Sequence, residues 1–378
     1  MTEPGVKLFS QQPAEQKQDP LRKPARRDSK RSAYRGPETV ISKQEIEEIL
    51  TDYGVGEISS IEDISTMFCP NRIVLAFKPD GDLVNLKGLP NQEGDIVGYE
   101  TDIIALLNQE GVGVQQLITT KTGDYSVEKD GTLYLAYRKL EGDQIKDIDQ
   151  EVCREFGVHM ARLHKVLQKY AGHEPVPRVD ETFRHADDTP EQVGSFPLRT
   201  EYERLFAEFG SQINTEQLER QVIHGGVSTT HSFFVGKKFN AFIDWDYAHV
   251  GYRAYDVALF MADMLVSKPE LFADYLNAYT QENPLNDQEK KSLYYFIKYR
   301  LLFNIKKYNF YARTDSEQVK GRSVAQEMIK AYTLMDGMGL DGFLALTNRD
   351  TRPDVALIVT DADLERTGFK GVLHSRAE

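Results

Sequence analysis

The hydrophobic pattern of this 378-residue chain changes its period near Gly142, and this change limits the folds that the chain can adopt. Before it, Arg72–Lys78 and Leu83–Leu89 are rich in Val, Leu and Ile and flank a Pro-Asp-Gly turn, which predicts an antiparallel hairpin. Helical spacing follows in residues 149–170, 198–209 and 287–338. A strand-rich part followed by a mostly helical part indicates an α+β fold with a small antiparallel-sheet lobe and a larger helical lobe.

Further elements are expected in the first part of the chain. Ser42 and Glu45 form a capping-box pattern at the start of a helix that ends near Tyr53. A second helix is predicted from Glu100 to Glu110, with strands at 115–120 and 132–139. We therefore divide the chain into a disordered basic tail (1–40), an N-terminal nucleotide-binding lobe (41–142), a helical C-terminal lobe (143–340) and a tail or edge strand (341–378) that contains the apolar run Val355–Val359.

Composition narrows the functional classes. The formal net charge of -13 argues against nucleic acid as a partner, because a polyphosphate normally requires a basic surface. No apolar stretch is long enough for a membrane span and the N-terminus lacks an apolar signal core, so a cytoplasmic location is expected. Cys69 and Cys153 are predicted to be free thiols. The basic tail could dock to an acidic partner, although a plain solvated tail is the favoured interpretation, because a basic run alone is a weak signal.

The candidate chemistry is concentrated between residues 222 and 258. His224-Gly225-Gly226 follows an apolar strand, and His231 comes five residues after Gly226. A predicted hairpin leads to Phe242-Ile243-Asp244-Trp245-Asp246, and Tyr255-Asp256 opens the next helix. A carboxylate directly after an apolar strand lies on a rigid support, and carboxylate oxygens are the ligands that Mg²⁺ prefers.

This segment resembles the catalytic region of the aminoglycoside-phosphotransferase and choline-kinase family, which has a protein-kinase-like fold. In that family a histidine-glycine-aspartate triplet is followed five residues later by asparagine, then by an isoleucine-aspartate-tryptophan stretch and an aspartate that opens a helix. The resemblance extends over roughly Gln44 to Met338 and includes Met160–His164. It implies that the chain binds ATP, or another nucleoside triphosphate, together with Mg²⁺ in a cleft between the lobes.

The resemblance also implies roles for individual residues. Lys87 would contact the nucleotide phosphates and Glu100 would pair with it, while Asp244 would bind the metal. Asp246 would contact the water shell of the metal or bind backbone amides nearby. Asp256 is expected to hold the catalytic segment together through backbone hydrogen bonds, and His224 is expected to be satisfied inside the loop rather than to act as a base.

Two departures from the family pattern affect the transfer step itself. Gly226 stands where the family has its catalytic aspartate, and His231 stands where it has a metal-binding asparagine. Glycine cannot accept a hydroxyl proton, and imidazole binds Mg²⁺ poorly although it suits softer metals. The turn at residues 65–70 also offers no glycine with which backbone amides could wrap a phosphate.

Several functions therefore stay open at this point. The chain could transfer phosphate to a hydroxyl of a small molecule or a peptide, more slowly by the roughly 10²–10⁴-fold that a general base supplies. It could instead be a pseudokinase that serves as a binding or regulatory module, or it could transfer a nucleotidyl group. A lipase-like hydrolase is disfavoured because the chain lacks a Gly-x-Ser-x-Gly elbow to accompany His224-Gly225-Gly226.

Overall fold

The structure is a computed structural model, which describes residues 41–65, 71–90, 94–145, 147–172, 198–310, 315–347, 361–367 and 369. The predicted disordered tail, the apolar run Val355–Val359 and Cys69 lie outside the described residues. Cys153 is a buried free thiol, as expected. None of the described helices has an apolar stretch long enough to cross a bilayer.

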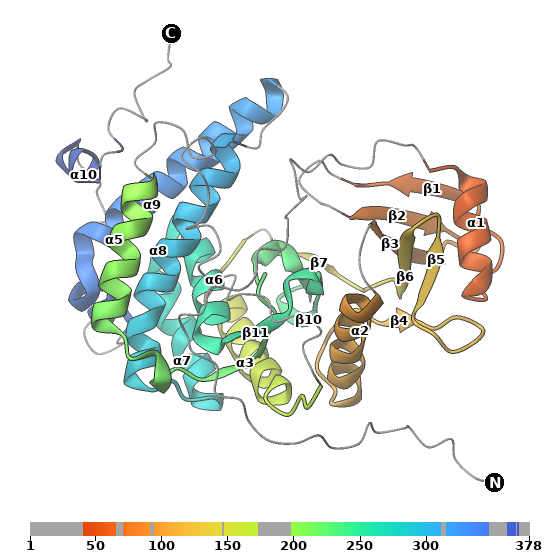
Figure 1. Cartoon of the computed structure of the whole chain (residues 1–378), viewed down its shortest axis with the longest axis horizontal. Coiled ribbons are helices and arrows are strands. Elements are labelled where there is room, and N and C mark those ends of the chain that lie inside the picture. Colours follow the sequence, from red (N-terminus) through yellow and green to blue (C-terminus); the bar gives the residue numbers. More distant parts are fainter. Residues whose placement is uncertain are drawn as a thin grey trace. The chain divides into compact units, whose positions relative to one another are not determined.

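The first part of the chain forms an antiparallel sheet (Figure 1). Its strands follow the order β1-β2-β3-β6-β4, and β5 pairs with β6. Their bounds are β1 Ser60–Asp63, β2 Arg72–Phe77, β3 Leu83–Pro90, β4 Leu117–Ile118, β5 Ser126–Lys129 and β6 Thr132–Arg138. The predicted hairpin is β2 and β3, in which Arg72 lies opposite Gly88. The short strands β1 and β5 were not predicted.

Side chains of β3 alternate between the two faces of the sheet, as extended backbone requires. Leu86 belongs to a small core that also contains Ile46 and Leu50 of α1 (Lys43–Asp52). The neighbouring Lys87 is buried on the opposite face, where Leu89 joins the larger core. The capping box of α1 is present, with the side chain of Ser42 accepting from the backbone of Glu45 and the side chain of Glu45 accepting from the backbone of Ser42.

The second helix of this lobe, α2, spans Gly94–Gln109 and therefore begins six residues before the predicted start at Glu100. Its apolar face buries Ile103, Ile104 and Leu107 completely. The earlier start places Glu100 in the middle of the helix, where its backbone is fixed on both sides. A glycine at position 94 gave no sequence signal for a helix beginning there.

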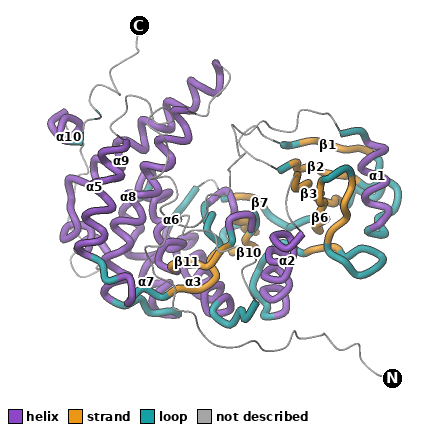
Figure 2. Tube along the Cα trace, in the orientation of Figure 1, coloured by secondary structure: helices purple, strands orange, loops and turns teal. Residues whose placement is uncertain are grey.

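Helices dominate the remainder of the chain, and Figure 2 shows them as a mostly helical part joined to the sheet-rich part. Their bounds are α3 Gln150–Leu167, α5 Leu198–Gln212, α6 Arg253–Ser267, α7 Phe272–Glu282, α8 Asp287–Phe310, α9 Asp315–Thr347 and α10 Asp361–Arg366. The long helices α8 and α9 pack along one another, and α6 packs against α8. The larger hydrophobic core runs through these helices.

The stretch of helical spacing predicted over residues 287–338 contains two helices, α8 and α9. α9 also continues to Thr347 and contains a kink at Gly339, whose φ of 68° is left-handed. The described residues after position 340 are mostly helical, in the end of α9 and in α10, where a tail or an edge strand was expected. Apolar residues at helical spacing hide such breaks, because the pattern continues on either side of them.

The residues between 222 and 246, with a predicted strand and hairpin, contribute to two small sheets in the helical part. β9 (Ser232–Val235) pairs with β10 (Lys238–Phe242) and with β7 (Asp143–Gln144), while β8 (Arg220–Ile223) pairs with β11 (His249–Tyr252). All three strand pairings in these two sheets are antiparallel. They hold the loop 224–231 at its two ends, and the α+β, two-lobed fold class predicted from the sequence is confirmed.

Candidate functional site

A buried ion pair joins β3 to α2. The Nζ of Lys87 lies 3.0 Å from Oε1 of Glu100, and the two residues are only 4% and 5% exposed. The hydroxyl of Tyr137, from the neighbouring strand β6, donates to the same oxygen at 3.4 Å. The structure therefore brings together the two residues that the sequence assigned to phosphate binding.

Asp246 of the short 3-10 turn Trp245–Tyr247 lies against this pair. Its carboxylate accepts from the Nζ of Lys87 and from the side-chain amide of Asn71. Burial raises the pKa of Asp246, and the nearby carboxylates of Asp244 and Glu100 raise it further against the opposing effect of Lys87. The pKa of Lys87 is nevertheless held well above its ordinary value, because two carboxylates outweigh its burial. A cation and two anions thus share one enclosed space.

Asp244 lies two residues after the end of β10 and has left-handed backbone angles, with φ 67° and ψ 68°. Aspartate is one of the few residues that enter this region at moderate cost. Burial opposes its charged form, but Lys87, His231 and His224 together lower the pKa of Asp244. Its side chain is 31% exposed, so an ionised carboxylate at this position is accessible to a ligand.

The loop after β8 is fixed by Asp256 at the start of α6. The amide N–H groups of His224 and Gly225 donate to the two oxygens of this carboxylate at 2.7 and 2.8 Å. His164 of α3 contacts it at 3.2 Å through Nε2. The expectation that Asp256 organises the loop through backbone hydrogen bonds is confirmed by these contacts. Gly225 has φ 73°, and a Cβ there would lie 2.3 Å from the carbonyl oxygen of Tyr247, so only glycine fits.

His224 is completely buried and both of its ring nitrogens have partners within the protein. Nε2 lies 2.9 Å from the carbonyl oxygen of Ile243, so it donates, and Nδ1 accepts from the amide of Gly226 at 3.2 Å. Burial lowers the pKa of His224, which agrees with the hydrogen bond that its Nδ1 accepts. A base for a substrate needs a nitrogen that can reach the substrate, so this histidine holds the loop.

Gly226 occupies the position of the family aspartate. Its φ is not left-handed, so a side chain would be tolerated by the backbone. A Cβ built there would approach Cδ2 of Tyr247 to 3.3 Å, because the tyrosine ring covers this position. The carbonyl oxygen of Gly226 lies 2.5 Å from Nδ1 of His231. No carboxylate is therefore present where the family places its base.

His231 links the loop to the metal candidate. Its Nε2 lies 3.3 Å from Oδ2 of Asp244, and its backbone carbonyl accepts from the amide of Ile243 at 3.0 Å. The structure thus brings the two metal candidates named from the sequence side by side. Their side chains are 27% and 31% exposed.

Two further residues near the site were missed in the sequence. Asn71, 2% exposed, donates to Asp246, and its own Oδ1 has no partner among the described residues. Asp263 of α6 accepts from the amide of Thr229 at 3.3 Å and interacts electrostatically with Arg300 and His231. Asp263 lies seven residues after Asp256, which is two helical turns on the same face, and that spacing could have revealed it.

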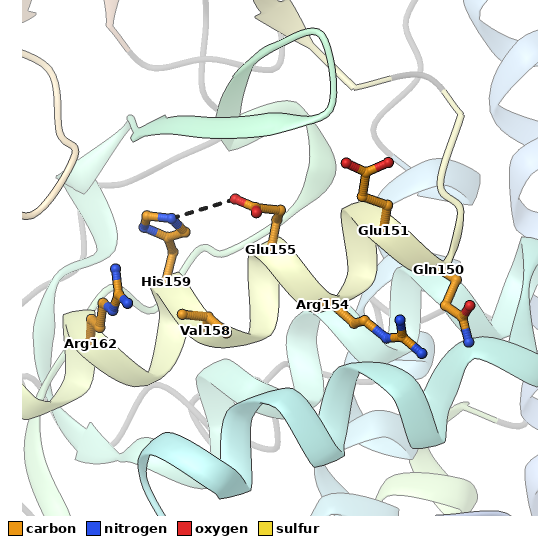
Figure 3. A pocket seen from close by; sticks show the side chains of 7 residues that line it. All are labelled: Gln150, Glu151, Arg154, Glu155, Val158, His159 and Arg162. Carbon is orange, nitrogen blue, oxygen red and sulfur yellow. Dashed lines mark ion pairs between the residues drawn. The ribbon is translucent and has the colours of Figure 1, made fainter.

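A cavity of about 530 Å³ lies elsewhere, along α3 (Figure 3). Its lining comes entirely from this helix and includes Arg154, Arg162 and the Glu155–His159 ion pair, which spans 3.7 Å. None of these residues belongs to the ion-pair and loop cluster described above. The candidate site is therefore identified by its chemistry and not by this cavity.

Comparison with known proteins places this geometry in context. The sequence profile described as "APH: Phosphotransferase enzyme family" matches residues 97–290. Homoserine kinase from Rhodopseudomonas palustris (strain BisB5) is 23% identical over 269 residues, which are 68% of this chain and 80% of that protein. The homoserine kinase of Agrobacterium fabrum is 22% identical over 268 residues, or 68% of this chain and 81% of the relative.

Solved structures show the same fold at low identity. A microcompartment-associated aminopropanol kinase superposes with a TM-score of 0.65 at 15% identity and covers 81% of this chain and 100% of that one. An amicoumacin kinase in complex with AMP-PNP, Ca²⁺ and Ami has a TM-score of 0.63 at 14% identity, with 79% of this chain and 95% of that chain covered.

Proposed function

Since the chain belongs to the phosphotransferase enzyme family, we propose that it binds ATP or another nucleoside triphosphate with a divalent metal and transfers the terminal phosphoryl group to a hydroxyl of a small molecule. The buried Lys87–Glu100 pair beside Asp244 and Asp246 is the observation that carries this proposal. Phosphoryl transfer requires mainly charge neutralisation and placement of the nucleophile, and these residues offer both.

The nucleotide side of the site is assigned to Lys87. Its ammonium group neutralises phosphate oxygens, and Glu100 keeps the side chain extended toward them. The carboxylate of Asp246 also accepts a hydrogen bond from the Nζ of Lys87, so a phosphate at Lys87 has to compete with this carboxylate. The competition is feasible because burial raises the pKa of Asp246 and makes its charged form easier to displace or to protonate.

The donors at Asp244 and His231 fit a divalent cation, since an ionised carboxylate oxygen and an imidazole nitrogen lie 3.3 Å apart and both are accessible. When bound, such an ion neutralises charge on the transferred group. Asp244 has a left-handed backbone and lies two residues after the end of β10.

The acceptor hydroxyl needs a base from another position, because Gly226 has no side chain that could accept a proton. In the transfer, the acceptor hydroxyl oxygen bonds to the terminal phosphorus, the bond to the bridging oxygen of the nucleoside diphosphate breaks, and the hydroxyl proton leaves. We assign this proton to Asp263, the carboxylate of α6 that accepts from the amide of Thr229 in the loop, two helical turns after Asp256. The carboxylate of Asp256 accepts from two backbone amides and contacts His164, so these contacts hold it in a structural role. Burial raises the pKa of Asp263, which makes its carboxylate a stronger base.

The first acceptors to test follow from the related proteins. Homoserine and aminopropanol, named in the relatives' descriptions, each carry an amine and a hydroxyl group. We therefore propose an amino alcohol as the first acceptor class, with peptides as the second. The cytoplasmic location expected from the sequence forms part of the same proposal.

The test begins with calorimetry of AMP-PNP binding to the native chain, with and without a divalent metal. Binding should require the metal and should weaken at least tenfold in Asp244→Asn, while Asp341→Asn, a change at an exposed position of α9, should bind as the native chain does. Transfer is then followed by ³¹P NMR with ATP and the acceptors. Release of ADP supports phosphoryl transfer, whereas release of pyrophosphate would identify nucleotidyl transfer.

Two other outcomes would replace this proposal. Metal-dependent AMP-PNP binding without turnover on any acceptor would make the protein a pseudokinase, consistent with the covered position at Gly226. No AMP-PNP binding under any condition would reject a nucleotide site altogether.

A further inference from the structure

Arg300, a partly buried residue of α8, carries a charge for which the described residues provide no hydrogen-bond acceptor. Its Nε is buried and has no hydrogen-bond partner among these residues. The guanidinium carbon lies 5.5 Å from the centre of the ring of Phe303, which packs near the charge but offers no oxygen to its N–H groups. A buried donor without an acceptor costs free energy, so this guanidinium is suited to an anion that binds from outside the chain.

Arg300 lies near the carboxylate that we assigned as the base. It interacts electrostatically with Asp263 of α6, the helix that packs against α8 (Figure 1). Asp263 accepts from the amide of Thr229 at 3.3 Å, which places both charges at the loop 224–231. Among the contacts of the described residues, however, no ion pair or hydrogen bond joins Arg300 to Asp263. An arginine that served to neutralise this carboxylate would form such bonds with it, so the guanidinium lies beside the base but is not used by it.

A second polar side chain without a partner lies one turn further along α8. Asn304 is only 6% exposed, and its amide makes no hydrogen bond with another described residue. Buried amides are normally hydrogen-bonded, so this side chain is also suited to a ligand. Residues four apart on a helix lie on the same face. Arg300 and Asn304 therefore provide neighbouring N–H donors, one of them charged, on one face of α8.

We propose that Arg300 and Asn304 bind a carboxylate of the acceptor, and that the acceptor is a hydroxyl compound that carries this carboxylate. A guanidinium and a carboxylate form paired, charge-assisted hydrogen bonds in a fixed geometry. A carboxylate bears a single charge, so Asp263 repels it less than it would repel a phosphate group with nearly two charges. The inference rests on the proposed function, because Asp263 is the base assigned there. It narrows the amino alcohols proposed above to those that also have a carboxylate.

The test compares two pairs of compounds in which one member lacks the carboxylate: homoserine with 3-amino-1-propanol, and serine with ethanolamine. Calorimetry measures their binding to the full chain, with and without AMP-PNP. In at least one pair we expect the member with the carboxylate to bind at least tenfold more tightly. This advantage should disappear in Arg300→Gln and persist in part in Arg300→Lys, which keeps the charge but not the paired geometry.

Arg220→Gln is the matched control and should keep the full advantage of the carboxylate. Arg220 is an exposed residue of β8, and its guanidinium carbon also lies 5.5 Å from the centre of an aromatic ring, that of Tyr252. The affinity of the two amino alcohols should be the same in the native chain and in Arg300→Gln, which shows that the variant is folded.

Equal affinities within both pairs, or an advantage that persists undiminished in Arg300→Gln, would overturn the inference. A loss of AMP-PNP affinity in Arg300→Gln, with the amino alcohols still bound, would place this arginine at the nucleotide and overturn it as well. Release of ADP from ATP separates these results from a failure of the proposed function. Carboxylate binding that depends on Arg300, without ADP release, supports the acceptor site and rejects phosphoryl transfer. ADP release at equal rates with both members of each pair supports transfer and overturns the carboxylate site.

Discussion

Replacing Lys87 by methionine tests whether the ion pair at the centre of the site is as enclosed as the structure has it. Methionine keeps the length of the side chain but removes the charge. Among the described residues, Glu100, 5% exposed, would retain the hydroxyl of Tyr137 at 3.4 Å, and Asp246 would retain the amide of Asn71. Removing one partner of a buried ion pair costs about 3–5 kcal/mol, because the remaining charge is left without compensation.

We expect this loss in the free energy of unfolding of Lys87→Met, measured by urea denaturation without nucleotide. At about 2–4 °C per kcal/mol for a large domain, the Tm should fall by roughly 10 °C. Lys121→Met, at an exposed lysine, is the control and should stay within about 0.5 kcal/mol of the native chain.

A triple variant distinguishes the free energy lost by leaving buried charges unbalanced from the free energy lost through altered packing. Adding Glu100→Gln and Asp246→Asn to Lys87→Met removes all three charges, so most of the stability should return although AMP-PNP should no longer bind. The reasoning would be refuted if Lys87→Met cost less than about 1 kcal/mol, or if the triple variant were no more stable than the single one.

Three further predictions concern the loop and the helical lobe. Gly226→Asp should raise the rate of ADP release in the presence of an acceptor about 10²-fold, since a positioned base returns; Gly226→Ala meets the same contact with Tyr247 and should not raise it. Asp263→Asn should lower that rate at least 10²-fold while AMP-PNP binding stays unchanged, and an unaltered rate would exclude Asp263 as the base. Burial lowers the pKa of Lys306 to about 8, whereas an unfolded lysine titrates near 10.4. The unfolded state therefore binds more protons between these values, and the free energy of unfolding should rise by up to about 3 kcal/mol as pH increases from about 8 to 10.5. Lys306→Met should lack this rise when the two unfolding curves are compared at each pH.

Much of the candidate site could be predicted because its residues follow strand ends at fixed spacing. Asp244 comes two residues after β10, and His231 comes directly before β9, so the hairpin between them determines their proximity. Lys87 and Glu100 belong to consecutive elements, β3 and α2. In each case two residues that are close in the sequence are also close in the structure, so the sequence pattern is sufficient to find the pair.

The rest of the site depends on contacts that leave no local pattern. Asn71 reaches Asp246 across 175 positions of sequence, and nothing around Asn71 distinguishes it from an ordinary residue before a strand. The start of α2 and the strands β1 and β5 were missed for a different reason. Their exposed or polar residues carry little of the hydrophobic periodicity on which such predictions depend.

Helix α6 also constrains the length of the chain around the site. Asp256 binds the loop at His224 and Gly225, and Asp263 binds it at Thr229. Two positions of one helix therefore fix the number of loop residues between these contacts. Loops usually accept insertions and deletions, but a single residue added to α6 between these aspartates would turn Asp263 by about 100° away from Thr229. We expect natural variation in length to be excluded from residues 224–229 and from 256–263 together. The spacing of Asp256 and Asp263 on this helix therefore fixes the number of residues in the loop but not their identity.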